Sequence, residues 1–375
     1  MYRKTIILCC AFLLLGCSSD TAIIGISGPD TTPSASPTSV TEKIELPLTR
    51  MQKPGGLKIV QSYTMPKAAG GITSGFGFEN GILWSRGCSD DKANELMFSA
   101  DFGLHWQFIK APRSDRENDS DGLGADGGFD FTDSENGWAF DSSTVIHTTD
   151  GGKSWRLQDD LLKRFDLTSI QAIHFIDKDI GFLGASASRV IEKGLGTSYF
   201  AVVVLCTTNG GDTWQVCKKV ESLNDIQSIA SSSGRTAILA DGAILFTDDL
   251  GKNWKRVDLH EYVTDLASDP SGKFWITQAD GRLRSSTDFV SWVDTLIDQA
   301  QSSKKLLTIA FSDTGSGFGL VGGGDGFLAM TEDLGKTWKM VDQDRIKGNI
   351  WKIRINESKV AILEGGRTIW VAEPK

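Results

Sequence analysis

Histidine and tyrosine are scarce in this chain of 375 residues, which contains four of each. The histidines stand far apart, without the spacing of a zinc site; they are His105, His147, His174 and His260. We therefore expect no metal centre and no cofactor built on histidine, and we place these side chains in packing or at the surface.

Positive charge is also in deficit. The chain has 39 Lys and Arg residues against 48 Asp and Glu, which gives a formal net charge of −9. Domains that bind nucleic acids usually carry a basic footprint. The composition therefore argues against a nucleic-acid partner.

Long apolar runs are missing except for residues 6–15, which follow Arg3 and Lys4. A run this short does not span a bilayer and is typical of a cleaved signal peptide, here residues 1–16. It ends in Leu-Leu-Gly-Cys17, which resembles the lipobox of bacterial lipoproteins. The resemblance implies a lipid anchor on Cys17 and, with Ser18 following, delivery to the outer membrane of the cell envelope. An ordinary secretory signal with an unrelated cysteine is the alternative.

The segment after the signal peptide, residues 17–45, is rich in Ser, Thr and Pro. Such a composition buries too little apolar surface to fold, so it predicts a tether. Residues 46–375 are long enough to bury a large core as one domain.

Only three cysteines follow Cys17, namely Cys88, Cys206 and Cys217. Cys206 and Cys217 flank one predicted hairpin turn and are the candidate disulfide pair in an oxidising compartment. Neighbours across a hairpin can also point to opposite faces of the sheet, so the sequence leaves the bridge open.

What the sequence does contain is an internal repeat. The pattern S/T-x-D-x-G-x-x-W occurs at residues 99–106, 148–155, 247–254 and 331–338, and a fifth copy at 207–214 carries Asn209 in place of Asp. In a sixth copy, at 285–292, Thr287 and Phe289 stand where Asp and Gly are expected, so we expect this copy to have decayed. The residues to which we assign a structural role are Asp101, Trp106, Asp150, Trp155, Asn209, Trp214, Asp249, Trp254, Asp333 and Trp338.

Local chemistry explains the repeat. A carboxylate can accept hydrogen bonds from backbone N–H groups of its own turn, and glycine tolerates a backbone conformation that a Cβ atom penalises. The tryptophan then covers the base of the hairpin.

Strand patterns around the repeats predict the fold. Two strand signals precede each repeat, a third strand leads into it and a fourth leaves from its Trp, which describes a four-stranded blade. Seven such units are present, and the last lacks its fourth strand. We expect residues 57–63 to supply that strand and to close a ring, because an open edge would promote aggregation.

The repeats resemble Asp-boxes, also called BNR repeats, which are found in sialidases, sortilin-type receptors and the photosystem II assembly-factor family. The resemblance implies an all-β fold, a single seven-bladed β-propeller, in which the boxes are structural turns. It covers nearly the whole chain after residue 57.

A glycosidase is the alternative hypothesis. A sialidase needs an arginine cluster, a tyrosine nucleophile and acid partners on one face. The Arg-Ile-Pro motif of that family is missing, and only residues 345–347 are faintly similar to it. We therefore predict that the chain is not an enzyme, with glycan binding or hydrolysis as the alternative.

A weak calcium motif occurs in residues 117–122. Asp119 and Asp121 resemble the start of a calcium loop, but the twelfth position holds Gly128 instead of a bidentate acid. A solvated loop is the preferred interpretation.

Long connections distinguish the first three blades, at residues 86–94, 111–127 and 185–198. Turns between second and third strands share one face of a propeller with the blade-to-blade crossings, so these loops and the crossing at 159–166 should gather there. Long loops on rigid scaffolds often carry function, although surface insertion without function explains them equally well. The candidate partner-binding residues in this sector are Arg86, Arg113, Arg116, Arg164, Arg189 and Lys193.

Together these features favour a lipid-anchored, non-enzymatic scaffold that presents its loop-rich face to another protein. An envelope inhibitor or immunity lipoprotein remains a further alternative.

Overall fold

The computed structural model describes residues 56–64, 77–79, 81–86, 95–101, 103–110, 112, 127–190, 198–297, 304–341, 344–356, 359–365 and 368–374. They belong to one compact unit, Met51–Lys375. No helix in this described part is long and apolar enough to cross a membrane. The predicted signal peptide, the tether and Cys17 lie outside the described residues.

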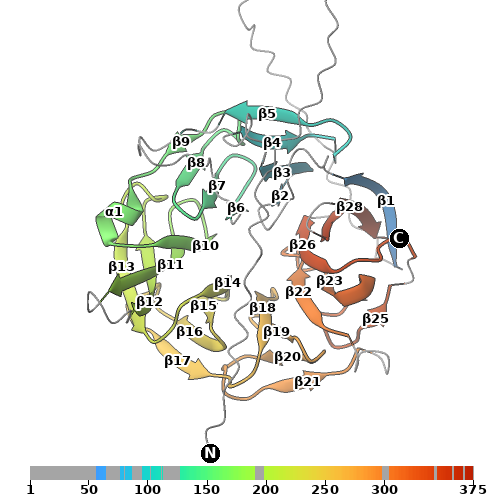
Figure 1. Ribbon diagram of the computed structural model, residues 1–375. Coiled ribbons are helices and arrows are strands. Elements are labelled where there is room, and N and C mark those ends of the chain that lie inside the picture. The colour runs from blue at the N-terminus through green and yellow to red at the C-terminus, as the bar shows by residue number, and fades with distance from the viewer. Residues whose placement is uncertain are drawn as a thin grey trace, which may run out of the picture. The chain divides into compact units, whose positions relative to one another are not determined.

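Seven four-stranded antiparallel sheets surround one axis, which confirms the predicted propeller (Figure 1). The first three blades are β2(Gly77–Glu79), β3(Ile82–Arg86), β4(Glu95–Ser99), β5(Gln107–Lys110); β6(Gly127–Phe131), β7(Gly137–Asp141), β8(Val145–Thr148), β9(Arg156–Leu157); and β10(Ser169–Phe175), β11(Gly181–Val190), β12(Ser198–Thr207), β13(Gln215–Glu221). Blades 4 and 5 are β14(Ile226–Ser232), β15(Arg235–Ala240), β16(Ala243–Thr247), β17(Lys255–Asp258); and β18(Val263–Ser268), β19(Phe274–Gln278), β20(Leu283–Ser286), β21(Val293–Thr295). Blade 6 is β22(Leu306–Phe311), β23(Gly319–Gly323), β24(Leu328–Thr331), β25(Lys339–Met340), and blade 7 is β26(Ile350–Asn356), β27(Lys359–Glu364), β28(Thr368–Pro374) with β1(Leu57–Thr64).

The ring closes through its first strand. β1 pairs antiparallel with β28, from Leu57 opposite Pro374 to Thr64 opposite Thr368. The strand predicted from residues 57–63 therefore supplies the outer strand of blade 7, as expected from the missing fourth strand.

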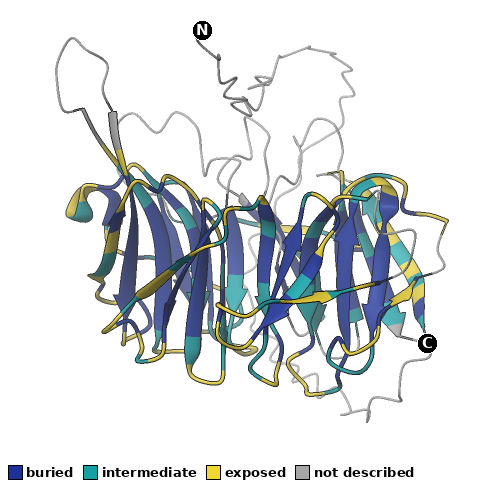
Figure 2. Cartoon of the chain, turned by 90° about the horizontal axis from the view of Figure 1, so that it is seen from below, coloured by how far each residue is buried: buried dark blue, intermediate teal, exposed yellow. Residues whose placement is uncertain are grey.

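The core lies between the blades. In the described residues each blade interface holds a cluster of buried apolar side chains, to which second strands contribute three tryptophans. Trp84, Trp138 and Trp275 are at most 2 % exposed. Figure 2 shows the sheets from the side, with buried residues along the strands and exposed residues gathered in the turns.

The two faces of the ring differ. The box face carries the turns between third and fourth strands, where the repeats lie. The crossing face carries the turns between second and third strands and the blade-to-blade crossings, which bond to one another, as when Leu259 N–H donates to the Gly242 carbonyl. This shared face was predicted. The crossing from blade 2 to blade 3 contains the helix α1(Leu161–Phe165), capped by the Asp160 side chain.

The prediction of a long loop at residues 185–198 is wrong in its length. β11 continues through Val190 and pairs with β12 from Ser198 onward, so the two strands extend as a regular ladder. The facing segment of β12 begins Ser-Tyr-Phe-Ala-Val-Val, and its aromatic and β-branched residues favour a strand over an irregular loop.

Candidate protein-binding surfaces

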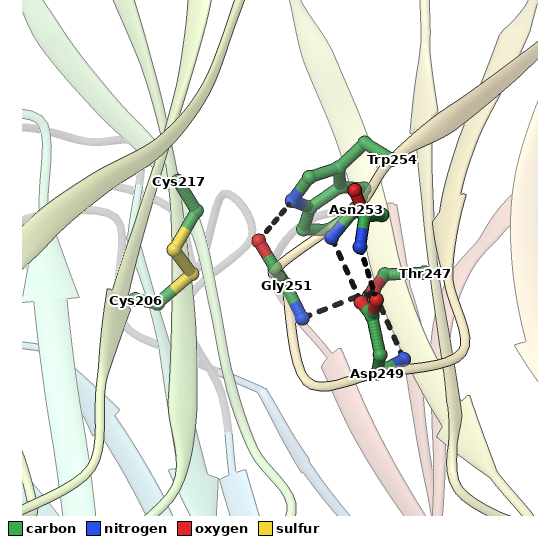
Figure 3. The surroundings of a disulfide bond; sticks show 7 residues. All are labelled: Cys206, Cys217, Thr247, Asp249, Gly251, Asn253 and Trp254. Carbon is green, nitrogen blue, oxygen red and sulfur yellow. Dashed lines mark hydrogen bonds between the residues drawn. A yellow bond between two sulfur atoms is a disulfide. The ribbon is translucent and has the colours of Figure 1, made fainter.

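The box turns are built from hydrogen bonds within each turn. In blade 4, Thr247 Oγ1 donates to Asp249 Oδ1 at 2.8 Å and accepts from Gly251 N–H at 3.0 Å (Figure 3). Asp249 Oδ1 also accepts from Asn253 N–H at 2.8 Å, and Trp254 Nε1 donates to the Gly251 carbonyl at 3.0 Å. In the other boxes the backbone N–H four residues further on donates the equivalent hydrogen bond to the side chain of Asp101, Asp150, Asn209 or Asp333.

These bonds set the ionisation of the box carboxylates. Hydrogen bonds from the side chain and backbone of Asn253 lower the pKa of Asp249 to about 2. For Asp150 and Asp333, burial raises the pKa, but hydrogen bonds from Ser154 and Thr337 outweigh it, and the net shift is downward. Such carboxylates are held as anions by their own turns, which suits a structural role better than proton transfer.

The sixth box has not decayed in the way that the sequence suggested. The frame is displaced by one residue: Ser286 Oγ donates to Asp288 Oδ1 at 3.0 Å, and Asp288 accepts from Ser291 N–H at 2.7 Å. One residue is missing between the Asp and Trp292, so Asp288 and not Thr287 holds the Asp position, whereas Phe289 does stand in the place of the glycine and makes its backbone bonds.

Phe289 replaces the box glycine by filling a space. Its φ is +62°, in the left-handed region, yet the side chain is completely buried. It lies in one cluster with Ala237, which occupies the second-strand position held by Trp138 and Phe182 in earlier blades. A small residue on one blade is therefore compensated by a large one on the next.

Cys206 and Cys217 form a disulfide, with their Cα atoms 5.9 Å apart. The ladder between β12 and β13 slips between Val204 and Leu205, so Cys217 is an extra residue on its strand. Both sulfurs lie beside Gly251 of the next blade, where an added Cβ would come within 2.8 Å of Cys206 Sγ. The bridge thus lies beside the box turn of blade 4 (Figure 3).

The predicted partner-binding cations lie mostly outside the description. Arg113, Arg116 and Lys193 are not described, and Arg86 and Arg189 are described only by their backbone, at the end of β3 and near the end of β11. Arg164 is described, on α1, where it forms an ion pair with Asp159 and lies 5.4 Å from the centroid of the Phe165 ring. Exposed ion pairs contribute little stability, so Arg164 can exchange Asp159 for another anion at small cost.

The weak calcium motif also lies beyond what the structure describes, because Asp119 and Asp121 fall in the undescribed segment 113–126. Within the described ranges, no group of three or more His, Cys, Asp or Glu residues is placed to hold a metal ion.

Polar side chains on the innermost strands bond to the neighbouring blade, a set that the sequence reasoning missed. Asp130 on β6 accepts from Phe175 N–H at 2.6 Å, with His174 Nδ1 3.4 Å from its carboxylate. Asp265 on β18 accepts from Thr308 Oγ1 at 3.0 Å. Each carboxylate therefore joins its blade to the next one, and burial of Asp265 at 6 % exposure is offset by these bonds.

A pocket of about 510 Å³ opens on the crossing face between blades 4 and 5. Its lining includes Tyr262, whose side chain is largely exposed, and Glu261, which forms ion pairs with Arg282 and Arg284. The full lining is Asp241, Gly242, Arg256, Asp258, His260, Glu261 and Tyr262. No sequence motif marked it.

Known proteins share this architecture. No protein-family model matches the sequence, and no curated protein matches it either. A solved structure described as "YCF48 bound to D1 peptide" superposes with a TM-score of 0.60 at 18 % identity, over 87 % of this chain and 100 % of that one. The chain resembles YCF48 in fold. A structure of YCF48 from Cyanidioschyzon merolae superposes with a TM-score of 0.58 at 14 % identity, over 84 % of this chain and 99 % of that one. At these identities the likeness to YCF48 concerns the fold.

Proposed function

We propose that this chain is a non-enzymatic scaffold that binds another protein through its crossing face and is held in the cell envelope by a lipid on Cys17. The observation that carries the proposal is the difference between the two faces. Box-face turns repeat the same internally bonded geometry, whereas the crossing face carries α1, the extended β11–β12 ladder and a pocket. Irregular features on a regular scaffold are where binding usually resides.

The fold comparison supports a protein partner. The YCF48 structure is described as bound to a D1 peptide, so a propeller of this architecture can hold a polypeptide segment. For this chain the corresponding partner is a protein of the same envelope.

The state of the carboxylates supports a non-enzymatic role. Among the described residues, every carboxyl group with a shifted pKa has it lowered, including Asp101, Glu261 and Asp288. A glycosidase needs a general acid whose pKa is raised. None of these shifted groups fits that role.

A pull-down from the native envelope tests the binding face. We expect a variant with Arg113, Arg116, Arg164 and Arg189 changed to Glu to capture less partner than wild type, because charge reversal repels an acidic surface. The matched control reverses Lys252 and Lys336, which are exposed in the box turns. Equal losses from both variants, or loss from the control alone, would show that the crossing face is not the binding face.

Labelling with a radioactive fatty acid tests the anchor. Wild type should incorporate the label, and Cys17→Ser should yield an unlabelled protein that is released from membranes and melts like wild type, since the lipid attaches outside the propeller. An unlabelled wild-type protein whose mature N-terminus is not Cys17 would disprove the lipid anchor and leave the binding face untouched.

A further inference from the structure

The inner strand of blade 7 departs from the repeat. In the inner strands of blades 3 to 7 the ladder to the second strand slips by one residue near its start, on the side of the crossing face. Because the slip occurs at the same place in each of these strands, residues at the same distance from it occupy equivalent positions in the five blades. The extra residues are Gln171, Gln227, Thr264, Leu307 and Trp351, and the residues that pair next are Ala172, Ser228, Asp265, Thr308 and Lys352.

In blades 4 and 5 the residue at the position of Lys352 joins its blade to the next one. Ser228 Oγ accepts from Leu266 N–H of the next blade at 3.0 Å, and Asp265 accepts from Ile309 N–H at 3.3 Å. A lysine ammonium has donors only and cannot accept such a bond. Lys352 therefore does not continue this pattern of bonds between blades.

The direction of the blade 7 side chains follows from packing. Ile350, Ile353 and Ile355 pack in the cluster shared with blade 6. Because side chains alternate along a strand, Lys352 and Arg354 lie on the face of β26 that is turned away from blade 6. Their electrostatic partners place both cations near the axis, since Asp265 of blade 5 acts on both and Asp130 of blade 2 acts on Arg354.

No contact within the described part of the chain neutralises the charge of these two cations. Among the described residues, neither Lys352 nor Arg354 has a carboxylate oxygen within the 4.0 Å of an ion pair, and Arg354 donates to the neighbouring Ile353 carbonyl at 3.4 Å. Asp265 raises the pKa of Lys352, but burial and Arg354 outweigh it, and the net shift is downward. Burial likewise lowers the pKa of Arg354, against the upward effect of Asp130 and Asp265. Both cations are therefore available to an anion because neither has an ion-pair partner among the described residues.

We propose that Trp351, Lys352 and Arg354 form an axial site that binds a carboxylate of an acidic, extended peptide segment of the partner protein. An ammonium and a guanidinium side by side match a carboxylate. Trp351, 44 % exposed at the start of β26, offers an aromatic surface for an adjoining apolar side chain. The site rests on the proposed function and gives it a chemical specificity.

The position of Arg354 differs between the blades. It is occupied in blades 4 to 6 by Ala230, Ala267 and Ala310, and in blade 3 by His174. The alanine methyl groups are short and leave room for a peptide backbone on the side of blades 4 to 6.

A peptide selection tests the axial site. The folded full chain is used to select from a random library of twelve-residue peptides, and selected peptides are synthesised for titration. We expect enrichment of Asp and Glu over the starting library. Lys352→Gln with Arg354→Gln should bind those peptides about tenfold more weakly or worse, since each lost charged hydrogen bond is worth about 1.5–3 kcal/mol. Lys252→Gln with Lys336→Gln, in the box turns, should bind like wild type.

The outcomes separate the site from the function. Peptides without acidic bias, or equal binding by the axial variant and wild type, would disprove the axial site and leave a protein-binding scaffold. A wild-type protein that enriches no peptide would count against the scaffold itself and the axial site with it. If the double variant unfolds, Arg354→Lys and Arg354→Gln replace it: a site for carboxylate predicts binding by the first and loss by the second, and equal titrations would overturn the proposal.

Discussion

At the scale of the residue, the box aspartates show how one side chain can organise a turn. The chain also contains its own comparison, because Asn209 occupies the Asp position in blade 3 and still accepts from Thr213 N–H at 3.0 Å. Its amide nitrogen donates to Thr213 Oγ1 at 3.0 Å, where Asp333 instead accepts from Thr337 Oγ1 at 2.6 Å. A hydroxyl at this position can therefore serve either an amide or a carboxylate.

This comparison predicts unequal effects at Asp333. Asp333→Ala leaves Thr337 N–H without its acceptor and should cost about 1–3 kcal/mol. Asp333→Asn can adopt the arrangement of blade 3 and should cost clearly less. Thermal melts of both variants measure the difference, with Asn209→Ala as the matched loss in blade 3. If Asp333→Ala and Asp333→Asn melt alike, the backbone bond is not what the carboxylate contributes.

The same site predicts a dependence on pH. The folded pKa of Asp333 lies below that of an unfolded Asp, about 4. The ionised carboxylate therefore contributes its stability fully above that value and loses it as pH falls through the lower, folded pKa. The melting-temperature gap between wild type and Asp333→Asn should shrink between pH 5 and pH 2. A gap that widens on acidification would contradict the sign of the shift.

At the scale of the element, strand order was predictable and register was not. Alternating apolar residues and the spacing of the boxes fix which segments pair, so all seven blades and the closing strand could be expected. The slips at Cys217 and Trp351 add one residue to a strand, and a shift of one reverses the side on which a side chain lies. For this reason the sequence left the disulfide open and gave no sign that Lys352 and Arg354 border the axis.

The sixth box illustrates a second limit. Its frame depends on Phe289 filling space beside Ala237, residues that are distant in sequence and belong to different blades. A local motif search sees only the missing glycine. Packing between blades decides the outcome.

The disulfide gives a prediction for blade 3. Cys206 and Cys217 are 11 residues apart, and a closed loop of this size corresponds to about 3 kcal/mol of chain entropy in the unfolded state. Reducing conditions should therefore lower the melting temperature of wild type. The variant with both cysteines changed to Ala should melt low with or without reductant. An effect of reductant that persists in this variant would assign the change to another cysteine.

At the scale of the whole molecule, closure joins the two ends of the folded body. β1 comes from the start of the propeller and β28 from its end, so their ladder joins segments that are far apart in sequence. Without β1, β28 would expose a row of unpaired backbone groups at a sheet edge. Closure is therefore both a stabilising contact and a protection against edge-to-edge association.

The alternation along β1 allows this to be tested on one strand. Leu57 is buried in the cluster between blades 6 and 7, and Tyr63 packs with its ring 5.0 Å from Trp106, whereas Lys58 and Ser62 are exposed. Leu57→Asn with Tyr63→Asn should lower the melting temperature and increase sedimenting aggregates, because the lost burial weakens the strand that covers β28. Lys58→Asn with Ser62→Asn changes as many residues on the same strand and should behave like wild type. Equal behaviour of the two double variants would show that β1 is held by backbone pairing alone, and aggregation from the outward variant only would show that the exposed face of β1 is the protective one.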